Sequence, residues 1–338
     1  MGYRVWRCLL FPVLIALAFL LPEGTMAQPP PHFYATGRSE ERPQQFTLYK
    51  VHAETKQVLA SFDLSQYEGP VTLSGDGRQI LVMDGNKLFV LDADSFVLRD
   101  QFTMIAKEFP WSYAGVLFAH PKSSLLYIAR LGGSGPREIA VVDSRLRRVV
   151  KVLKLDSTIM AGFIYDSRRD RLYITAAPPT ILDPRTLRVI GYIDLSTRNT
   201  IFEMILSRDG NQLFLSGEGT NLYVYDLERA VVIRHSSPFL PSVTRLRHLA
   251  LSQDGSRLFA VTSAGGDPGT AAVLDTQTLT ILHVLTFTEP VGQFFTAPDG
   301  RGMWLTTKSG VLRLDHQTGK VLERVKLPFR LGKLLTPP

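Results

Sequence analysis

Residues 206–215 read LSRDGNQLFL and residues 223–232 read YVYDLERAVV, and this pair of segments recurs along the whole chain. Asp209-Gly210 is a tight-turn dipeptide, because glycine accepts a positive φ and aspartate can bond its own backbone. The apolar stretches that follow this turn and precede Asp226 are typical of buried strands. The unit therefore predicts strand a, a tight turn, strand b, a loop, strand c, an Asp-marked turn and strand d.

The Asp-marked turn recurs at a regular distance. Its six copies are centred on Asp92, Asp143, Asp183, Asp226, Asp275 and Asp315, and an earlier copy, YKVHAETKQV, carries His52 in the same place. Successive markers are 40, 51, 40, 43, 49 and 40 residues apart. Four antiparallel strands in about 40 to 45 residues is the blade period of a β-propeller. We interpret the recurring Asp as turn chemistry, and His52 and His316 as local structural residues of the same turns.

The two ends of the chain complement each other. Six complete units run at about 71–104, 115–155, 161–195, 201–236, 246–287 and 291–327. Residues 33–64 offer b, c and d strands, and Phe329 to Leu335 offers one further strand. We therefore expect an all-β, seven-bladed propeller, a single domain over residues 28–338, closed by pairing the C-terminal a strand with the N-terminal strands. This closure leaves no free sheet edge.

These repeats resemble those of the YVTN-repeat propellers, in which an L-Y-V-T-like b strand leads to a V-x-V-x-D-like c strand. The resemblance is carried by Leu126-Tyr127-Ile128 with Val141-Val142-Asp143, and by Leu258-Phe259 with Val273-Leu274-Asp275. The third unit departs from the pattern, because the loop between Thr175 and Ile181 is shorter than that of the family. The resemblance implies a superfamily of lactonase-like hydrolases, heavy subunits of quinoprotein amine dehydrogenases, and surface or periplasmic binding proteins.

The first 27 residues have the pattern of a secretory signal. Arg4 and Arg7 precede an apolar run of 14 residues from Cys8 to Leu21, and Thr25-Met26-Ala27 forms a small-residue cleavage site. A bilayer span needs about 20 residues, so we expect cleavage, with a retained anchor as the alternative. The mature protein is then periplasmic or secreted and has no membrane span. Cys8 is the only cysteine, which excludes disulfides and thiolate chemistry from the mature chain.

Charge gives little support for a nucleic-acid partner. Removal of the signal changes the formal net charge from +7 to about +6, and the basic residues are scattered. The densest run is Arg145, Arg147, Arg148, Lys151 and Lys154, interleaved with Val and Leu. This alternation is typical of a half-exposed outer strand, whose charges deter aggregation; a site for an anionic surface is the alternative.

Length variation concentrates in the b–c and d–a connections, which lie on one face because successive strands alternate in direction. Insertions on one face of a repeat protein commonly mark its binding surface, although surface loops also tolerate insertion without a functional reason. Candidate binding residues in these connections are Trp111, Tyr113, Arg137, Glu138, Arg245, Arg247 and Asp267.

Near the axis most a strands start with small residues, which crowding alone explains. Two units differ, with Phe202 followed by Glu203 and Arg247 followed by His248. An Arg and a Glu at a channel mouth indicate either a site for an anionic or polar ligand or an ion pair that closes the channel.

No catalytic, nucleotide or metal motif is present, since the seven histidines have no metal-ligand spacing and the Gly-rich stretches lack a phosphate-loop lysine. We therefore expect no cofactor and no metal. The favoured interpretation is an exported, non-catalytic propeller that binds a protein partner or a small ligand through its long-loop face. The alternatives are a lactonase-like hydrolase that uses Glu203, Arg247 and His248, and the scaffold subunit of a periplasmic oxidoreductase whose partner chain carries the redox chemistry.

Overall fold

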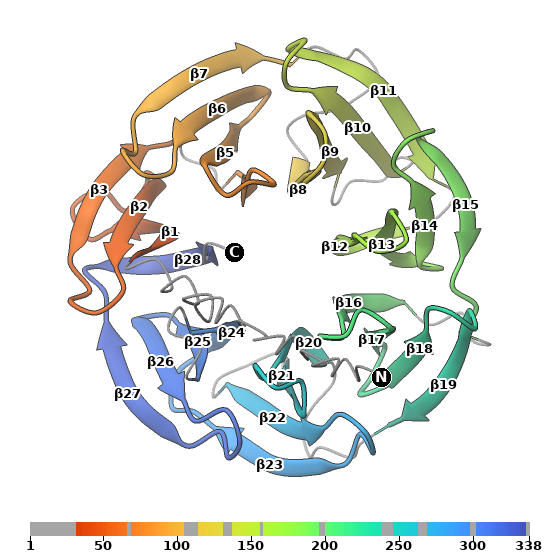
Figure 1. Ribbon diagram of the computed structural model, residues 1–338. Coiled ribbons are helices and arrows are strands. Elements are labelled where there is room, and N and C mark those ends of the chain that lie inside the picture. The colour runs from red at the N-terminus through yellow and green to blue at the C-terminus, as the bar shows by residue number, and fades with distance from the viewer. Residues whose placement is uncertain are drawn as a thin grey trace, which may run out of the picture.

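The computed structural model describes residues 32–65, 69–104, 114–130, 137–155, 158–195, 200–237, 246–262, 269–297 and 302–335. These residues form seven four-stranded antiparallel sheets arranged as a ring (Figure 1). The predicted seven-bladed β-propeller is confirmed, and the described residues contain no helix. The expected signal peptide lies outside them. No helix in the described part of the chain is long and apolar enough to cross a membrane.

Each blade has one strand in each of four positions, counted outward from the axis. The inner a strands are β4 (Val71–Leu73), β8 (Ala114–Ala119), β12 (Thr158–Asp166), β16 (Ile201–Leu206), β20 (Leu246–Leu251), β24 (Val291–Thr296) and β28 (Phe329–Leu335). The b strands are β1 (His32–Ser39), β5 (Gln79–Asp84), β9 (Leu125–Arg130), β13 (Arg171–Ala177), β17 (Gln212–Gly217), β21 (Arg257–Thr262) and β25 (Met303–Thr307).

The two outer positions follow the same order. The c strands are β2 (Thr47–His52), β6 (Lys87–Asp92), β10 (Arg137–Asp143), β14 (Thr180–Asp183), β18 (Leu222–Asp226), β22 (Thr270–Asp275) and β26 (Gly310–Leu314). The d strands are β3 (Val58–Asp63), β7 (Leu98–Thr103), β11 (Arg148–Leu155), β15 (Arg188–Tyr192), β19 (Val231–Ser236), β23 (Ile281–Thr286) and β27 (Val321–Lys326). We number the blades 1 to 6 from β4–β7 to β24–β27, and blade 7 is β28 with β1–β3.

Blade 7 closes the ring as predicted. β28 pairs antiparallel with β1, so that Phe329 lies opposite Ser39 and Leu335 opposite Tyr34. The Phe329 ring stacks on Tyr49 of β2 with 3.9 Å between ring centroids. The two ends of the chain therefore share one sheet and one core.

The core lies between the blades, because both faces of each sheet are covered by a neighbour. Side chains of the b and c strands such as Tyr127, Ile128 and Phe259 are fully buried. Burial of such a side chain contributes about 1.5–3 kcal/mol. The d strands are more exposed, and Tyr192 keeps 51% of its surface in solvent. The basic run around Arg148 lies mainly on one of them, β11, as expected for a solvated outer strand.

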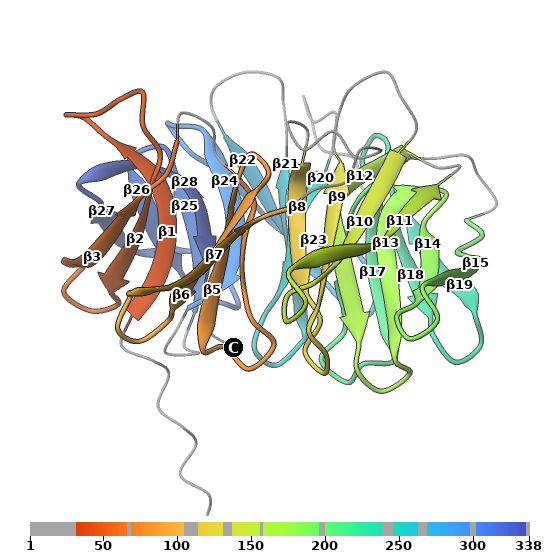
Figure 2. The same cartoon turned by 90° about the horizontal axis from the view of Figure 1, so that it is seen from above.

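The ring has two different faces (Figure 2). The a–b and c–d connections form one face, here called the turn face, and each is four to six residues long. The b–c and d–a connections form the long-loop face, where ten residues separate β7 from β8 and nine separate β19 from β20. The prediction that the longest connections lie on one face is confirmed by the positions where the strands begin and end.

The c–d turns owe their shape to the repeated Asp. The Asp226 carboxylate accepts the N–H groups of Glu228 and Arg229 at 3.0 and 2.9 Å. The other five Asp residues accept the equivalent pairs of N–H groups. In blade 7, His52 Nδ1 takes this role and accepts the N–H groups of Glu54 and Thr55 at 3.2 Å each. The structural interpretation of the Asp series and of His52 is confirmed.

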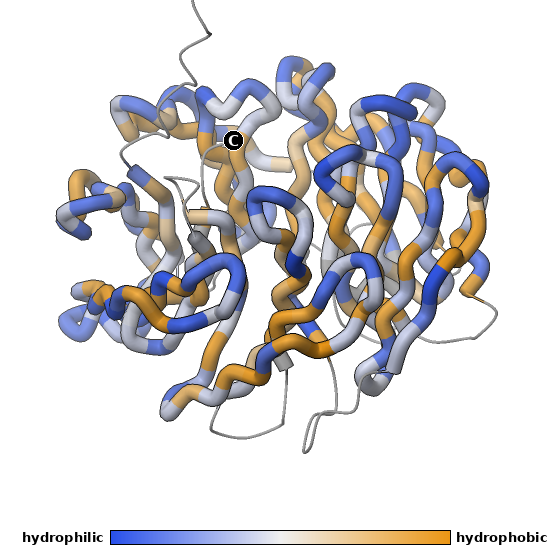
Figure 3. The backbone as a smooth tube through the Cα atoms, turned by 60° about the horizontal axis from the view of Figure 1, so that its bottom comes forward, coloured by the Kyte–Doolittle hydropathy of each residue, from blue (hydrophilic) through white to orange (hydrophobic). Residues whose placement is uncertain are grey.

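The Asp-Gly turns have a second local motif. The Ser207 hydroxyl donates to Asp209 at 2.6 Å and accepts the N–H of Gln212 at 2.9 Å, while Gly210 takes the positive φ of 69° that a side chain would resist. The turns that start at Ser74 and Ser252 repeat these contacts. These turns are predominantly hydrophilic in Figure 3, whereas the strands carry the hydrophobic residues.

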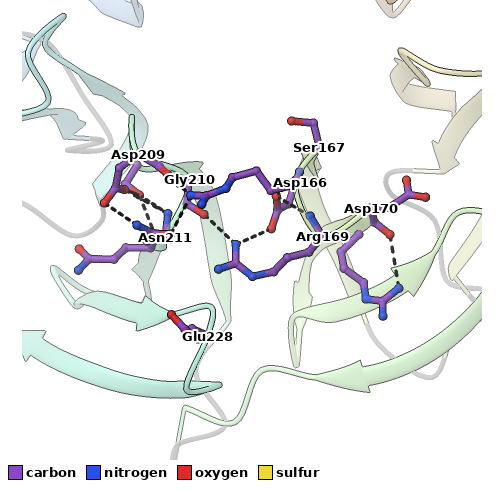
Figure 4. Close-up of polar contacts among 12 residues, drawn as sticks. Asp166, Ser167, Arg169, Asp170, Asp209, Gly210, Asn211 and Glu228 are labelled. Atoms are coloured by element: carbon purple, nitrogen blue, oxygen red, sulfur yellow. Dashed lines mark hydrogen bonds and ion pairs between the residues drawn. The ribbon is translucent and has the colours of Figure 1, made fainter. Parts of the chain in front are cut away.

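Neighbouring blades are tied together across the turn face. A basic side chain of one a–b turn donates to a main-chain carbonyl of the next a–b turn at three successive boundaries: Lys122 to Ser167 at 3.0 Å, Arg168 to Asp209 at 2.6 Å, and Arg208 to Ser252 at 3.2 Å. At the boundary of blades 3 and 4, Arg169 also joins the Asp166 carboxylate, at 3.0 Å, to the Gly210 carbonyl, at 2.8 Å (Figure 4).

Candidate functional site

The inner strands carry a bulge near the axis. The pairing of β16 with β17 shifts between Ile201 and Glu203, and that of β20 with β21 shifts between Arg247 and Ala250. The corresponding shifts in β8, β12, β24 and β28 fall at the small residues of those strands: Gly115, Ala161 with Gly162, Gly292 and Gly332. A bulge bends the strand and redirects its side chains, so crowding is only part of the explanation for these glycines.

Gly292 shows the local constraint most clearly. A Cβ atom there would lie 2.4 Å from the Thr306 hydroxyl oxygen. That hydroxyl instead accepts the N–H of Gln293 at 2.7 Å. Blade 6 therefore needs glycine at the position that Phe202 and Arg247 occupy in blades 4 and 5.

Phe202 and Arg247 form a contact across the boundary of blades 4 and 5. The Arg247 guanidinium lies over the Phe202 ring, 5.5 Å from its centroid, and the ring is buried. A cation above an aromatic face gains about 0.5–2 kcal/mol, depending on desolvation. The Arg247 Nε atom is buried and has no hydrogen-bond partner. The guanidinium is thus held in place by the ring while part of its donor capacity is unused.

Glu203 follows Phe202 on β16. Burial raises the pKa of its carboxyl group to about 7, and the positive charge of Arg247 opposes this shift. The residue keeps some accessible surface, but its carboxyl group lies deep within the ring of blades. No salt bridge joins it to Arg247 among the described residues, so the channel-closing ion pair is not formed there. At neutral pH the carboxyl group is divided between its protonated and ionised forms.

His248 follows Arg247 on β20 and has a left-handed backbone, with φ of 51°. A non-glycine residue in this region costs about 1–3 kcal/mol and is found preferentially at functional sites. Burial, and to a lesser extent the charge of Arg247, lowers the pKa of the imidazole to about 4. His248 is therefore neutral at pH 7 and can both donate and accept a hydrogen bond.

These three side chains come from neighbouring a strands that contact each other. They combine a permanent cation, a carboxyl group that titrates near neutrality and a neutral imidazole. Such a set can hold a carboxylate, and it can also move a proton to or from a bound molecule.

The other predicted binding residues are placed differently. Trp111, Tyr113, Arg245 and Asp267 lie outside the described residues. Arg137 is the first residue of β10, and the description does not include its side chain. Glu138 belongs to the same strand, opposite Lys154 of β11, and is 5% exposed. It is therefore a buried strand residue and not part of the preceding connection.

Sequence reasoning missed two features of the axis. The first is the contribution of Phe202, which the repeat alignment identified only as a departure from glycine. The second is a cavity of about 460 Å³ at the turn-face end, lined by Phe118, Phe163, Tyr165, Phe294, Phe295 and Arg208 together with aliphatic side chains. Its aromatic residues come from the inner strands of three blades and have no common spacing. Among the described residues, no group of three or more His, Cys, Asp or Glu side chains could hold a metal ion.

No protein-family model matches the chain, and no curated protein matches its sequence. The resemblance to YVTN-repeat propellers therefore stays a prediction. Solved structures are similar in fold. The periplasmic gluconolactonase PpgL of Pseudomonas aeruginosa superposes with a TM-score of 0.69 at 16% identity, over 91% of this chain and 99% of that one.

Two further structures have the same kind of likeness. The dihydro-heme d1 dehydrogenase NirN, in complex with DHE, gives a TM-score of 0.62 at 14% identity over 95% of this chain and 78% of its own. Hydrazine synthase of Kuenenia stuttgartiensis gives 0.59 at 13% identity over 83% and 90%. At such identities the likeness shows the fold alone, and this propeller fold is shared by proteins whose names give quite different activities.

Proposed function

We propose that this chain is an exported β-propeller that binds a small carboxylate-bearing molecule at the long-loop end of its axis. The observation that carries the proposal is the Arg247 guanidinium, which is fixed over Phe202 with a buried Nε that has no partner. A guanidinium fork matches a carboxylate in geometry and charge. Of the predicted binding residues, this proposal assigns the ligand to Arg247, Glu203 and His248.

The protonation states of the neighbours suit such a ligand. Because the pKa of Glu203 is about 7, its protonated form is available to donate a hydrogen bond to the carboxylate of the ligand. Because the pKa of His248 is about 4, its imidazole adds a neutral partner and no competing charge. Ionisation of Glu203 would place a second anion beside the ligand, so affinity should fall above pH 7, by up to about tenfold per pH unit.

Titration calorimetry tests this proposal. The purified protein is titrated with gluconate and other small hydroxy acids, and with glucose as an uncharged counterpart. We expect an acid to bind and Arg247→Ala to weaken it at least tenfold, about 1.4 kcal/mol. Arg188→Ala, which removes an exposed arginine from β15, should leave the affinity unchanged. Equal affinity in the two variants, or no binding of any acid, contradicts the proposal.

Lactone hydrolysis is a second candidate. It is favoured by a carboxyl group whose pKa is about 7, close to the ideal for a general base at neutral pH, and by the fold shared with a gluconolactonase. Ionised Glu203 would take a proton from water as the water oxygen bonds to the lactone carbonyl carbon. The ring C–O bond then breaks, and the ring oxygen leaves with the proton, which gives the hydroxy acid.

The pH dependence separates the two functions. Hydrolysis needs ionised Glu203, so its rate should rise through pH 7 and reach a plateau, whereas carboxylate binding should weaken over the same range. Glu203→Gln should abolish hydrolysis and leave carboxylate binding nearly independent of pH. Proton release from a panel of sugar lactones, followed at fixed pH, measures the rate directly.

Two parts of the functional prediction stay untested: one involves residues outside the described part of the chain, and the other depends on the family resemblance alone. Docking of a protein partner through Trp111 and Tyr113, and a role as the scaffold subunit of an oxidoreductase, stay predictions. A pull-down from the native envelope fraction tests both, because a stoichiometric redox partner would support the scaffold function.

A further inference from the structure

A second concave site lies on the long-loop face, where blade 6 meets blade 7. It is a groove of about 650 Å³, here called the seam groove. Its walls are the b–c connections of both blades, the d–a connection between them and the adjoining ends of β1, β27 and β28. Its lining includes Arg38, Lys308, Lys326 and Arg330. It is separate from the axial site, because none of its lining residues belongs to β16 or β20.

The seam groove has an excess of positive charge. Four basic residues line it against two acidic residues, Glu40 and Glu289. Lys308, Lys326 and Arg330 are exposed, and within the described part of the chain none of them has an ion-pair or hydrogen-bond partner for its side chain. Three unpaired cations in one groove produce a positive potential that attracts an anionic partner.

One of the two carboxylates is already used within the fold. Glu289 Oε2 accepts the Ser309 hydroxyl at 2.9 Å and the Ser309 N–H at 3.3 Å. These bonds fix the b–c connection of blade 6 beside the groove. Glu289 therefore orders the wall, and its charge only partly offsets that of the four basic residues.

The groove is built on ordered elements. The Arg38 guanidinium lies 4.0 Å from the centroid of the Phe46 ring and donates to the Pro43 carbonyl at 3.3 Å. Phe329 and Leu327, buried beneath the groove, belong to the core that closes the ring. A preorganised site loses less conformational entropy on binding than a mobile one.

We propose that the seam groove binds an extended acidic segment of a protein partner. Arg38, Lys326 and Arg330 lie at the ends of β1, β27 and β28, and Lys308 lies in the b–c connection of blade 6. Pro43 and Pro328 lie among them, so the lining alternates charge with apolar surface. A peptide with carboxylates separated by apolar side chains complements this pattern along its length, whereas one small anion would meet only part of it. This proposal is independent of the axial ligand.

A labelled peptide tests the groove directly. The probe is a fluorescein-labelled decapeptide of alternating glutamate and alanine, with the glutamine counterpart as the neutral control, and binding is followed by fluorescence anisotropy at low ionic strength. We expect the glutamate peptide alone to bind, and the triple variant Lys308→Glu, Lys326→Glu, Arg330→Glu to weaken it at least tenfold.

The matched control carries the same change in charge elsewhere. Arg148→Glu, Lys154→Glu and Arg188→Glu lie on exposed positions of the outer strands β11 and β15, and this triple variant should bind within twofold of the wild type. Thermal melting verifies that both triple variants fold.

Equal losses of peptide affinity in both triple variants would mean attraction to net charge only and would overturn the proposal. Inhibition by tripolyphosphate as effective as that by unlabelled peptide would also overturn it, in favour of a free-anion site. Arg247→Ala should keep full peptide binding, which separates this test from that of the axial site.

Discussion

The turn face and the long-loop face are ends of the same strands, yet they are organised by different rules. On the turn face each connection has four to six residues, and the same Asp, Ser and Gly contacts recur from blade to blade. On the long-loop face the connections vary from two to ten residues, and the contact that recurs there is a main-chain hydrogen bond from the residue after strand d to the residue before strand c, as from Met104 to Asn86 and from Leu327 to Ser309. The repeated side-chain contacts therefore lie on the face that ties the blades together, and the variation in connection length lies on the face of the axial site and the seam groove.

The largest expected effect comes from breaking the turn face at Asp166. This carboxylate is buried and accepts the N–H groups of Arg168 and Arg169 at 2.9 and 3.2 Å and the Arg169 guanidinium at 3.0 Å. Asp166→Ala leaves that guanidinium without its carboxylate and should cost about 2–4 kcal/mol of unfolding free energy, measured by chemical denaturation. Asp94→Ala removes an exposed carboxylate from a turn on the same face and should change stability by less than about 0.5 kcal/mol. Similar losses in both variants would show that the tie between blades 3 and 4 is not special.

The second largest effect is expected at the axis, where burial disfavours the ionised form of the Glu203 carboxyl group. The folded protein binds the Glu203 proton more tightly than the unfolded chain, because burial raises the pKa from 4.5 to about 7. The resulting stabilisation is complete below pH 4.5 and is lost as pH rises through 7. Relative to Glu203→Gln, the wild type should therefore lose about 1–3 kcal/mol of unfolding free energy between mildly acidic and mildly alkaline pH.

Denaturation of both proteins over this range measures the difference. Glu323→Gln, at an exposed position of β27, should follow the wild-type profile and is the control. The opposite contribution of His248, whose lowered pKa removes stability as pH falls below 6.5, is common to all three proteins and cancels. A wild-type profile parallel to that of Glu203→Gln would contradict a raised pKa.

The smallest effect is expected at the c–d turn of blade 7, where His52 replaces the Asp of the other blades. It tests whether this turn requires the imidazole or only an acceptor atom for the two N–H groups. His52→Ala removes the acceptor of two N–H groups and should cost about 0.5–1.5 kcal/mol. His52→Asp restores the residue of the other six blades and should stay within about 0.5 kcal/mol of the wild type in thermal and chemical denaturation. Equal losses in both variants would mean that the imidazole itself is required in blade 7.

The reliability of sequence reasoning also differs between the faces. The blade number, the closure by β28 and the roles of Asp226 and His52 were predicted, because each depends on residues within one turn or on a repeat of fixed period. Glu203, Arg247 and His248 were predicted as candidate site residues because their units depart from the glycines of the others, whereas Phe202 was noticed only as such a departure. Sequence reasoning left open whether they formed a closed ion pair or a binding site, because that depends on how two blades meet. Glu138 was predicted in the b–c connection but lies on β10. The reason is similar, because the sequence of a connection does not show which of its residues are buried between blades.

The sequence by itself determined the ring, since seven repeated units with apolar inner strands cover both faces of each sheet by stacking, and the complementary ends of the chain close the circle. The tertiary structure alone decided the chemistry at the axis and at the seam. Bulges in neighbouring inner strands bring a guanidinium onto a ring beside a carboxyl group of pKa about 7, and ring closure joins cations from residues 38 and 330 in one groove. These side-chain contacts depend on how one blade packs against the next, and no local pattern in the sequence shows that packing.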